Sequence, residues 1–292
     1  MPSSDQPAGV IDIVAAAWKA LTENVKLFLE FAVWSTALGV FLWLLILIVR
    51  SAVSDLAYVQ IITALISIPF SLAFSVITLA LIDAVWNALN RKPVSFQASL
   101  LIGLHRLLRF IWLSLLTGVV FLIAPAAVFG FGFLGVTALG PFLTQNFAVY
   151  AIVVAILTAL AAAALLIPIY FALPISFTAN LLMIEKIGGW KCIKQCANLV
   201  RGRWWRALWR LGVPALFFWL ASQFVLKIAY LLFGSLLGDP GLFYIAEDVS
   251  TVPSMLRSGF GLITAEMVYG LAAPLFVAAN LIVWHDLRRQ PQ

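Results

Sequence analysis

Six long apolar stretches, separated by short polar connections, dominate this chain of 292 residues. A bilayer core about 30 Å thick is crossed by roughly 20 apolar residues in helical conformation. Each stretch is long enough to do so. Together they predict an all-α integral membrane protein with six transmembrane helices in one polytopic domain over residues 1–292. The stretches cover residues 27–49, 56–82, 107–133, 147–184, 211–233 and 260–284.

The scarcity of charge supports the same fold class. Charged residues make up 10% of the chain, whereas a soluble domain has about 25%. So few charges do not cover a water-exposed surface, so lipid must solvate much of the protein. The net charge of +6 does not indicate nucleic-acid binding, because the basic residues lie at the edges of the apolar stretches and leave no free basic face.

Lysine and arginine gather on one side of the predicted spans. Of the eighteen, only Arg50 and Arg257 lie on the opposite side, and Lys227 lies within the fifth stretch. An excess of basic residues marks the cytoplasmic side, so we expect both termini in the cytoplasm and a bacterial-type inner membrane. The fifteen others are Lys19, Lys26, Arg91, Lys92, Arg106, Arg109, Lys186, Lys191, Lys194, Arg201, Arg203, Arg206, Arg210, Arg288 and Arg289.

Amphipathic stretches precede the first, third and fifth spans. In the first of them, Ile11 and Trp18 recur on one helical face, and Lys19 and Glu23 lie opposite. An apolar and a charged face repeating every 3.6 residues predict a helix that lies in the membrane interface. The arrangement predicts interfacial helices and three parallel two-span repeats. The stretches lie at about 10–26, 100–111 and 190–208.

The segment 190–210 is the first candidate for a functional surface. We expect one basic helix at the level of the lipid headgroups, with Trp190, Ile193 and Val200 on its apolar face. Such a helix binds an anionic lipid or an acidic partner, or it only anchors the chain and sets its topology. The sequence leaves both open. The candidate contact residues are Lys191, Lys194, Arg201, Arg203, Trp204, Trp205, Arg206 and Arg210.

A second candidate is an intramembrane charge pair, Lys227 and Glu266. Lys227 lies about six residues before the outer end of the fifth span, and Glu266 about six residues into the sixth span from the same side. Their depths should therefore be similar. Because a lone charge in hydrocarbon is costly, such residues usually pair or face water. The two residues form a structural salt bridge, or snorkel separately, or belong to an ion or proton relay or an outward-opening gate.

Residues for catalysis or metal binding are scarce. The chain has two cysteines, Cys192 and Cys196, and two histidines, His105 and His285. Cysteines four residues apart in a reducing compartment are usually free thiols, and a metal site needs more ligands nearby. We therefore expect no enzymatic activity, no cofactor and no metal site.

Two functional hypotheses remain. The first is a non-enzymatic scaffold or accessory factor that engages anionic membrane lipids, or a membrane-protein partner, through its basic cytoplasmic face. The alternative is a small transporter or lipid-handling protein that uses the space between the spans, with Lys227 and Glu266 as its intramembrane charges. A transporter needs a polar lining, and the spans supply little beyond these two residues.

The most distinctive segment is 177–206, with the sequence FTANLLMIEKIGGWKCIKQCANLVRGRWWR. It resembles the membrane domain attached to some bacterial glycerophosphodiester phosphodiesterases and its stand-alone six-span relatives. In that family a span ends at an acidic residue and glycine, and an amphipathic helix, a basic-glycine turn and a tryptophan follow. We expect no catalytic barrel with this domain, so the resemblance implies a membrane module concerned with envelope or lipid physiology, without the enzymatic activity.

Overall fold

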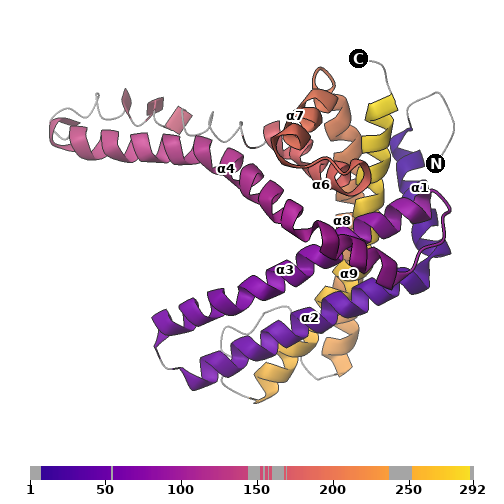
Figure 1. The fold of residues 1–292 in the computed structure, drawn as a ribbon. Coiled ribbons are helices and arrows are strands. Elements are labelled where there is room, and N and C mark those ends of the chain that lie inside the picture. The colour runs from indigo at the N-terminus through magenta and orange to yellow at the C-terminus, as the bar shows by residue number, and fades with distance from the viewer. Residues whose placement is uncertain are drawn as a thin grey trace. The chain divides into compact units, whose positions relative to one another are not determined.

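The computed structural model describes residues 8–53, 55–143, 152–153, 155–156, 158–159, 168, 170–236 and 252–289. All regular structure in these ranges is helical, which confirms the expected all-α fold. The helices are α1 (Val10–Glu23), α2 (Val25–Ala52), α3 (Leu56–Leu89), α4 (Phe96–Leu143), α6 (Thr178–Asn180), α7 (Gly189–Val200), α8 (Trp204–Leu236) and α9 (Val252–Arg289) (Figure 1). A π-helical turn, Leu181–Glu185, follows α6.

Several helices are apolar and long enough to cross a membrane, as a multi-pass membrane protein requires. Within the described ranges these are five: Val25–Ala52, Leu56–Leu89, Phe96–Val119, Trp204–Leu232 and Gly259–Arg289. The bent pair Tyr170–Glu185 and Gly189–Val200, with an angle of 118°, makes a sixth if it is counted as one span. Part of the predicted fourth span, 147–184, lies outside the described residues, chiefly 147–151 and 160–167.

Two predicted boundaries differ from the structure. The amphipathic stretch at 100–111 is not a separate helix, because α4 begins at Phe96 and runs through it. No proline lies between Phe96 and Pro125 to interrupt this helix. The single helix expected over 190–210 is two helices, α7 and α8. They are separated at Arg201–Arg203, where Gly202 adopts φ +74°, a conformation that glycine reaches without steric cost.

The described chain forms two compact units, Met1–Leu107 with Leu208–Gln292, and Leu108–Ala207. In the first unit α9 is the central helix and packs against α1, α2 and α3. The α2 and α9 backbones approach closely: a Cβ added to Gly270 would lie 2.9 Å from the Cα of Ala32. Small residues allow such close contacts between membrane helices. That the 292 residues form one polytopic domain stays a prediction.

Helix α8 runs antiparallel to α9 in the first unit. Arg210 contacts Asp286, Phe218 contacts Phe276, and further along α8 Tyr230 donates a hydrogen bond to the carbonyl of Gly261. These contacts bring the start of α8 and the end of α9 to one end of the unit.

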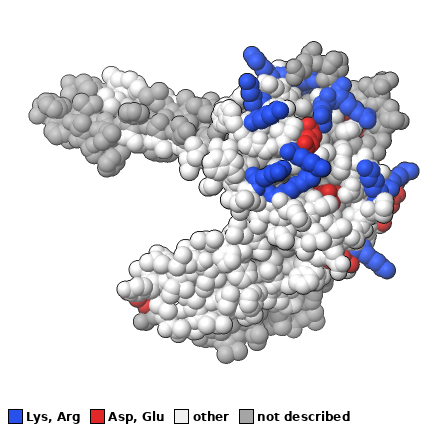
Figure 2. All heavy atoms as spheres, in the orientation of Figure 1, with Lys and Arg blue, Asp and Glu red and all other residues white. Residues whose placement is uncertain are grey.

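The same end of the first unit carries charge. On the face drawn in Figure 2, α2 and α3 show no lysine or arginine along most of their length, and basic side chains appear where α1 lies. The α1 helix itself buries Ile13, Ala17 and Ala20 and leaves Ile11 and Trp18 exposed. It therefore has a packed face beside the exposed apolar face that the sequence predicted.

Candidate functional site

The second unit contains α7, whose buried face is set by two cysteines. Cys192, Ile193, Cys196 and Val200 recur at helical spacing and are buried. The thiol of Cys192 donates a hydrogen bond to the carbonyl of Thr178 at 3.4 Å. Both cysteines are free, as expected. The buried cysteines fix the rotation of α7 and so decide which residues face outward.

The predicted apolar face of this helix packs inside the protein only in part, at Ile193 and Val200. Trp190 is 62% exposed, although it was placed with Ile193 and Val200 on the apolar face. The small cysteine side chains occupy the packed side instead, because residues 192, 196 and 200 share one helical face. Lys191 and Lys194 are exposed, as the sequence predicted.

The turn after α7 and the first turn of α8 continue the exposed surface. Arg201 and Arg206 are exposed, and Arg203 is half-buried. Trp205 is 77% exposed. We call Lys191, Lys194, Arg201, Arg203, Trp205 and Arg206 the basic surface. No carboxylate in the described part of the chain forms an ion pair with Lys191, Lys194, Arg201 or Arg206.

Trp204 anchors this surface from within. Its ring stacks on Tyr170, with 5.9 Å between the ring centroids and 10° between the planes. Its indole Nε1 also donates a hydrogen bond of 3.0 Å to the Tyr170 carbonyl. Trp205 meets it edge-on, at 4.8 Å between centroids. Trp204, predicted as a contact residue, therefore holds the turn in place, and Trp205 is the more exposed indole.

Arg210 does not belong to the exposed surface, contrary to the prediction. It is only 7% exposed and lies in the first unit. Its guanidinium pairs with the carboxylate of Asp286, and its Nε and Nη2 donate hydrogen bonds of 3.1 and 2.8 Å to the carbonyl of Ala8. Partners 76 and 202 positions away are not visible in local sequence.

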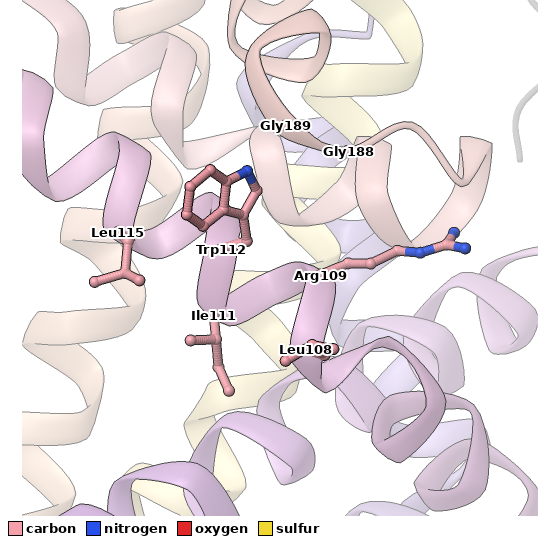
Figure 3. Close-up of a pocket in the computed structure, with 7 residues that line it drawn as sticks. All are labelled: Leu108, Arg109, Ile111, Trp112, Leu115, Gly188 and Gly189. Atoms are coloured by element: carbon pink, nitrogen blue, oxygen red, sulfur yellow. The ribbon is translucent and has the colours of Figure 1, made fainter.

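A groove in the second unit was not predicted. Its volume is about 650 Å³, and it is lined by α4 and by the glycines that begin α7. Figure 3 shows the Trp112 indole turned toward Gly188 and Gly189, and the Arg109 side chain extending away from Trp112 and Leu115. The lining residues are Leu108, Arg109, Ile111, Trp112, Leu115, Gly188 and Gly189. No local pattern in the sequence indicates that α4 and the turn at Gly188 and Gly189 lie next to each other.

The predicted pair of Lys227 and Glu266 is not formed. A hydrogen bond from Gln223 to Tyr269 at 2.6 Å and the one from Tyr230 to Gly261 set the register of α8 and α9. In this register Lys227 and Glu266 are at nearly the same level. The described residues nevertheless contain no ion pair between them.

Glu266 packs on a different helix instead. A Cβ added to Gly39 of α2 would lie 3.3 Å from the carboxyl carbon of Glu266. Lys227 is exposed, and Glu266 is half-buried. The absence of a side chain on Gly39 gives the Glu266 side chain room beside α2.

Comparisons with known proteins add no assignment. No family model, curated protein or solved structure matches this chain. In the ranges that the structure describes, no three His, Cys, Asp or Glu side chains gather as they would around a metal ion. The resemblance to the phosphodiesterase membrane domains stays a prediction.

Proposed function

We propose that this protein is a non-enzymatic membrane scaffold or accessory factor that engages anionic phospholipids through the basic surface. The observation that carries the proposal is the exposure of Lys191, Lys194, Arg201 and Arg206 with no ion-pair partner in the described chain. Basic side chains without a carboxylate partner, on a short helix, the turn after it and the start of the next helix, attract a negatively charged surface.

The exposed tryptophans support a position at the lipid headgroups. The indoles of Trp190 and Trp205 lie beside the basic residues and are mostly exposed. Tryptophan is enriched at membrane interfaces, because its ring is apolar and its N–H is polar. Each basic residue near an anionic leaflet contributes about 1 kcal/mol. The four unpaired residues together supply roughly 4 kcal/mol before salt screens them.

The arrangement of the first unit supports a common side for both termini. The backbone N–H of Ala8 donates a hydrogen bond of 3.0 Å to the carboxylate of Asp286 near the end of α9. The two ends of the described chain therefore lie side by side. Together with the excess of basic residues, the pairing of the two ends supports a position of both ends on the cytoplasmic face of a bacterial-type inner membrane.

A lipid titration tests the proposal. The purified full chain in detergent would be titrated with phosphatidylglycerol and, separately, with zwitterionic phosphatidylcholine, and bound lipids counted by native mass spectrometry. We expect a preference for phosphatidylglycerol that falls at least tenfold, on the order of 1 kcal/mol per charge, in Lys194→Glu/Arg201→Glu/Arg206→Glu. A preference that survives this triple change would refute the proposal.

A matched control separates this surface from total charge. Arg50, Lys26 and Lys92 are exposed residues of the first unit. Changing all three to glutamate alters the net charge by the same amount and leaves the basic surface intact. We expect this variant to keep the wild-type preference. An equal loss in both variants would mean that net charge alone sets the preference.

A further inference from the structure

The groove of the second unit is almost entirely apolar. Leu108 is 78% exposed, and Trp112 and Leu115 are each 58% exposed. These residues recur at intervals of four and three along α4, so they form one stripe on one side of the helix. The turn at Gly188 and Gly189 forms the facing wall. Gly189 adopts φ +64°, which favours glycine at this point of the wall.

One cation borders this apolar surface. Arg109 lines the groove and is exposed, and its side chain extends away from Trp112 and Leu115 in Figure 3. It forms no ion pair with a carboxylate of the described residues. Guanidinium groups bind phosphate through two parallel hydrogen bonds. An apolar stripe with a guanidinium at its edge that pairs with no described carboxylate matches a molecule that has an acyl chain and a phosphate.

We infer that this groove holds one anionic phospholipid, with its phosphate at Arg109 and an acyl chain along the apolar stripe of α4. A free phosphate or nucleotide would leave the stripe exposed, and an uncharged apolar molecule would leave the guanidinium without a partner. The volume of about 650 Å³ lies within the range of small-molecule sites, about 300–1,000 Å³.

The inference rests on the proposed function in one respect, since both require an anionic lipid. It goes further, because it places one lipid molecule in a groove rather than headgroups along a surface. The groove contains none of the residues of the basic surface. Variants of one site therefore leave the other unchanged, and the two claims fail separately.

A photoactivatable phosphatidylglycerol with a diazirine in its acyl chain tests the inference. The full chain would be reconstituted in phosphatidylcholine nanodiscs with a trace of this probe, irradiated and digested with a non-specific protease. We expect labelling of peptides that cover 108–115, displaced by unlabelled phosphatidylglycerol and not by phosphatidylcholine. Arg109→Gln should lower this labelling roughly fivefold.

Arg91→Gln is the matched control, because Arg91 is an exposed arginine of the first unit. It should leave the labelling unchanged. Arg109 forms no ion pair with a described carboxylate, so its variant should fold, and gel filtration would check this.

Other outcomes overturn the inference in different ways. Labelling of 108–115 that does not depend on Arg109 or on the headgroup would show an ordinary boundary lipid. Labelling confined to 190–206 would refute the groove and leave the proposed function standing. No labelling that depends on phosphatidylglycerol at either place would refute both. A stoichiometric polypeptide that shields 108–115 would show that a protein helix occupies the groove.

Discussion

Arg210 on α8 and Asp286 on α9 form an ion pair that is largely removed from solvent, with side-chain exposures of 9% and 20%. Both groups also bond the backbone of Ala8, through its carbonyl and its N–H. One arginine and one aspartate thus tie the start of the described chain to the ends of two long helices. Removing one partner would leave the other poorly solvated.

Arg210→Met should therefore destabilise the protein. We expect a loss of about 2–3 kcal/mol, toward the lower end for buried pairs because Asp286 keeps some contact with solvent. Thermal unfolding in detergent, followed by tryptophan fluorescence, measures the change. Arg210→Met/Asp286→Leu should recover part of it, since no unpaired charge remains. A double variant less stable than the single one would contradict this account.

Gly270 should not tolerate a larger side chain. A Cβ at this position would lie 2.9 Å from the Cα of Ala32, so Gly270→Ala must push α2 and α9 apart. We expect a lower Tm for Gly270→Ala. Gly212→Ala is the control, because no atom lies within 4 Å of the added Cβ. It should be neutral or slightly stabilising, since alanine favours a helix by about 1 kcal/mol over glycine. A Tm for Gly270→Ala equal to that of the wild-type protein would show that α2 and α9 lie further apart than in this structure.

Cys192 and Cys196 should be unreactive in the folded protein. Both side chains have no exposed surface, and a thiol must be reached as thiolate to react. We expect no labelling by a maleimide reagent in mild detergent and labelling of both residues after denaturation. Lys194→Cys places a thiol on the exposed side of the same helix and should react at once. Rapid labelling of wild-type protein would show that α7 is rotated or loosely packed.

Lys227 and Glu266 should contribute to stability independently. The two residues are level with each other but form no ion pair in the described structure. In a double-mutant cycle with Lys227→Leu and Glu266→Leu, we expect the effects to add within about 0.5 kcal/mol. A larger coupling energy, with the double variant rescued, would show a salt bridge and revive the predicted pair.

Both termini should lie on one side of the membrane. The hydrogen bond from Ala8 to Asp286 places the two ends of the described chain together. If both ends are cytoplasmic, as proposed, green fluorescent protein fused to either terminus should fluoresce, and alkaline phosphatase fused there should be inactive. A cysteine in place of Ser51, at the other end of α2, should react with an impermeant reagent from outside. Opposite behaviour of the two termini would contradict this orientation.

The sequence predicted the helices better than their contacts. Apolar stretches long enough to span a bilayer indicated the all-α fold, because hydropathy depends on local composition. The exposure of Lys191 and Lys194 followed from helical periodicity. The burial of Arg210 did not, because its partners Ala8 and Asp286 are distant in sequence.

The same limit applies to the sites. The depth of Lys227 and Glu266 was predictable from residue counts, but the packing of Glu266 on Gly39 requires knowledge of which helices are neighbours. The groove beside Arg109 likewise depends on a contact between α4 and the start of α7. The wrongly predicted ion pair and the missed groove therefore both depend on tertiary contacts rather than on helix assignment.

The most direct test of anionic-lipid engagement is the lipid content of the protein itself. The full chain would be extracted from native membranes in mild detergent, purified, and analysed by mass spectrometry for every lipid and polypeptide that remains. The account predicts that anionic phospholipids are enriched over their share of the membrane. Lipids in the proportions of the bulk membrane, or a stoichiometric protein partner with no enriched lipid, would contradict it.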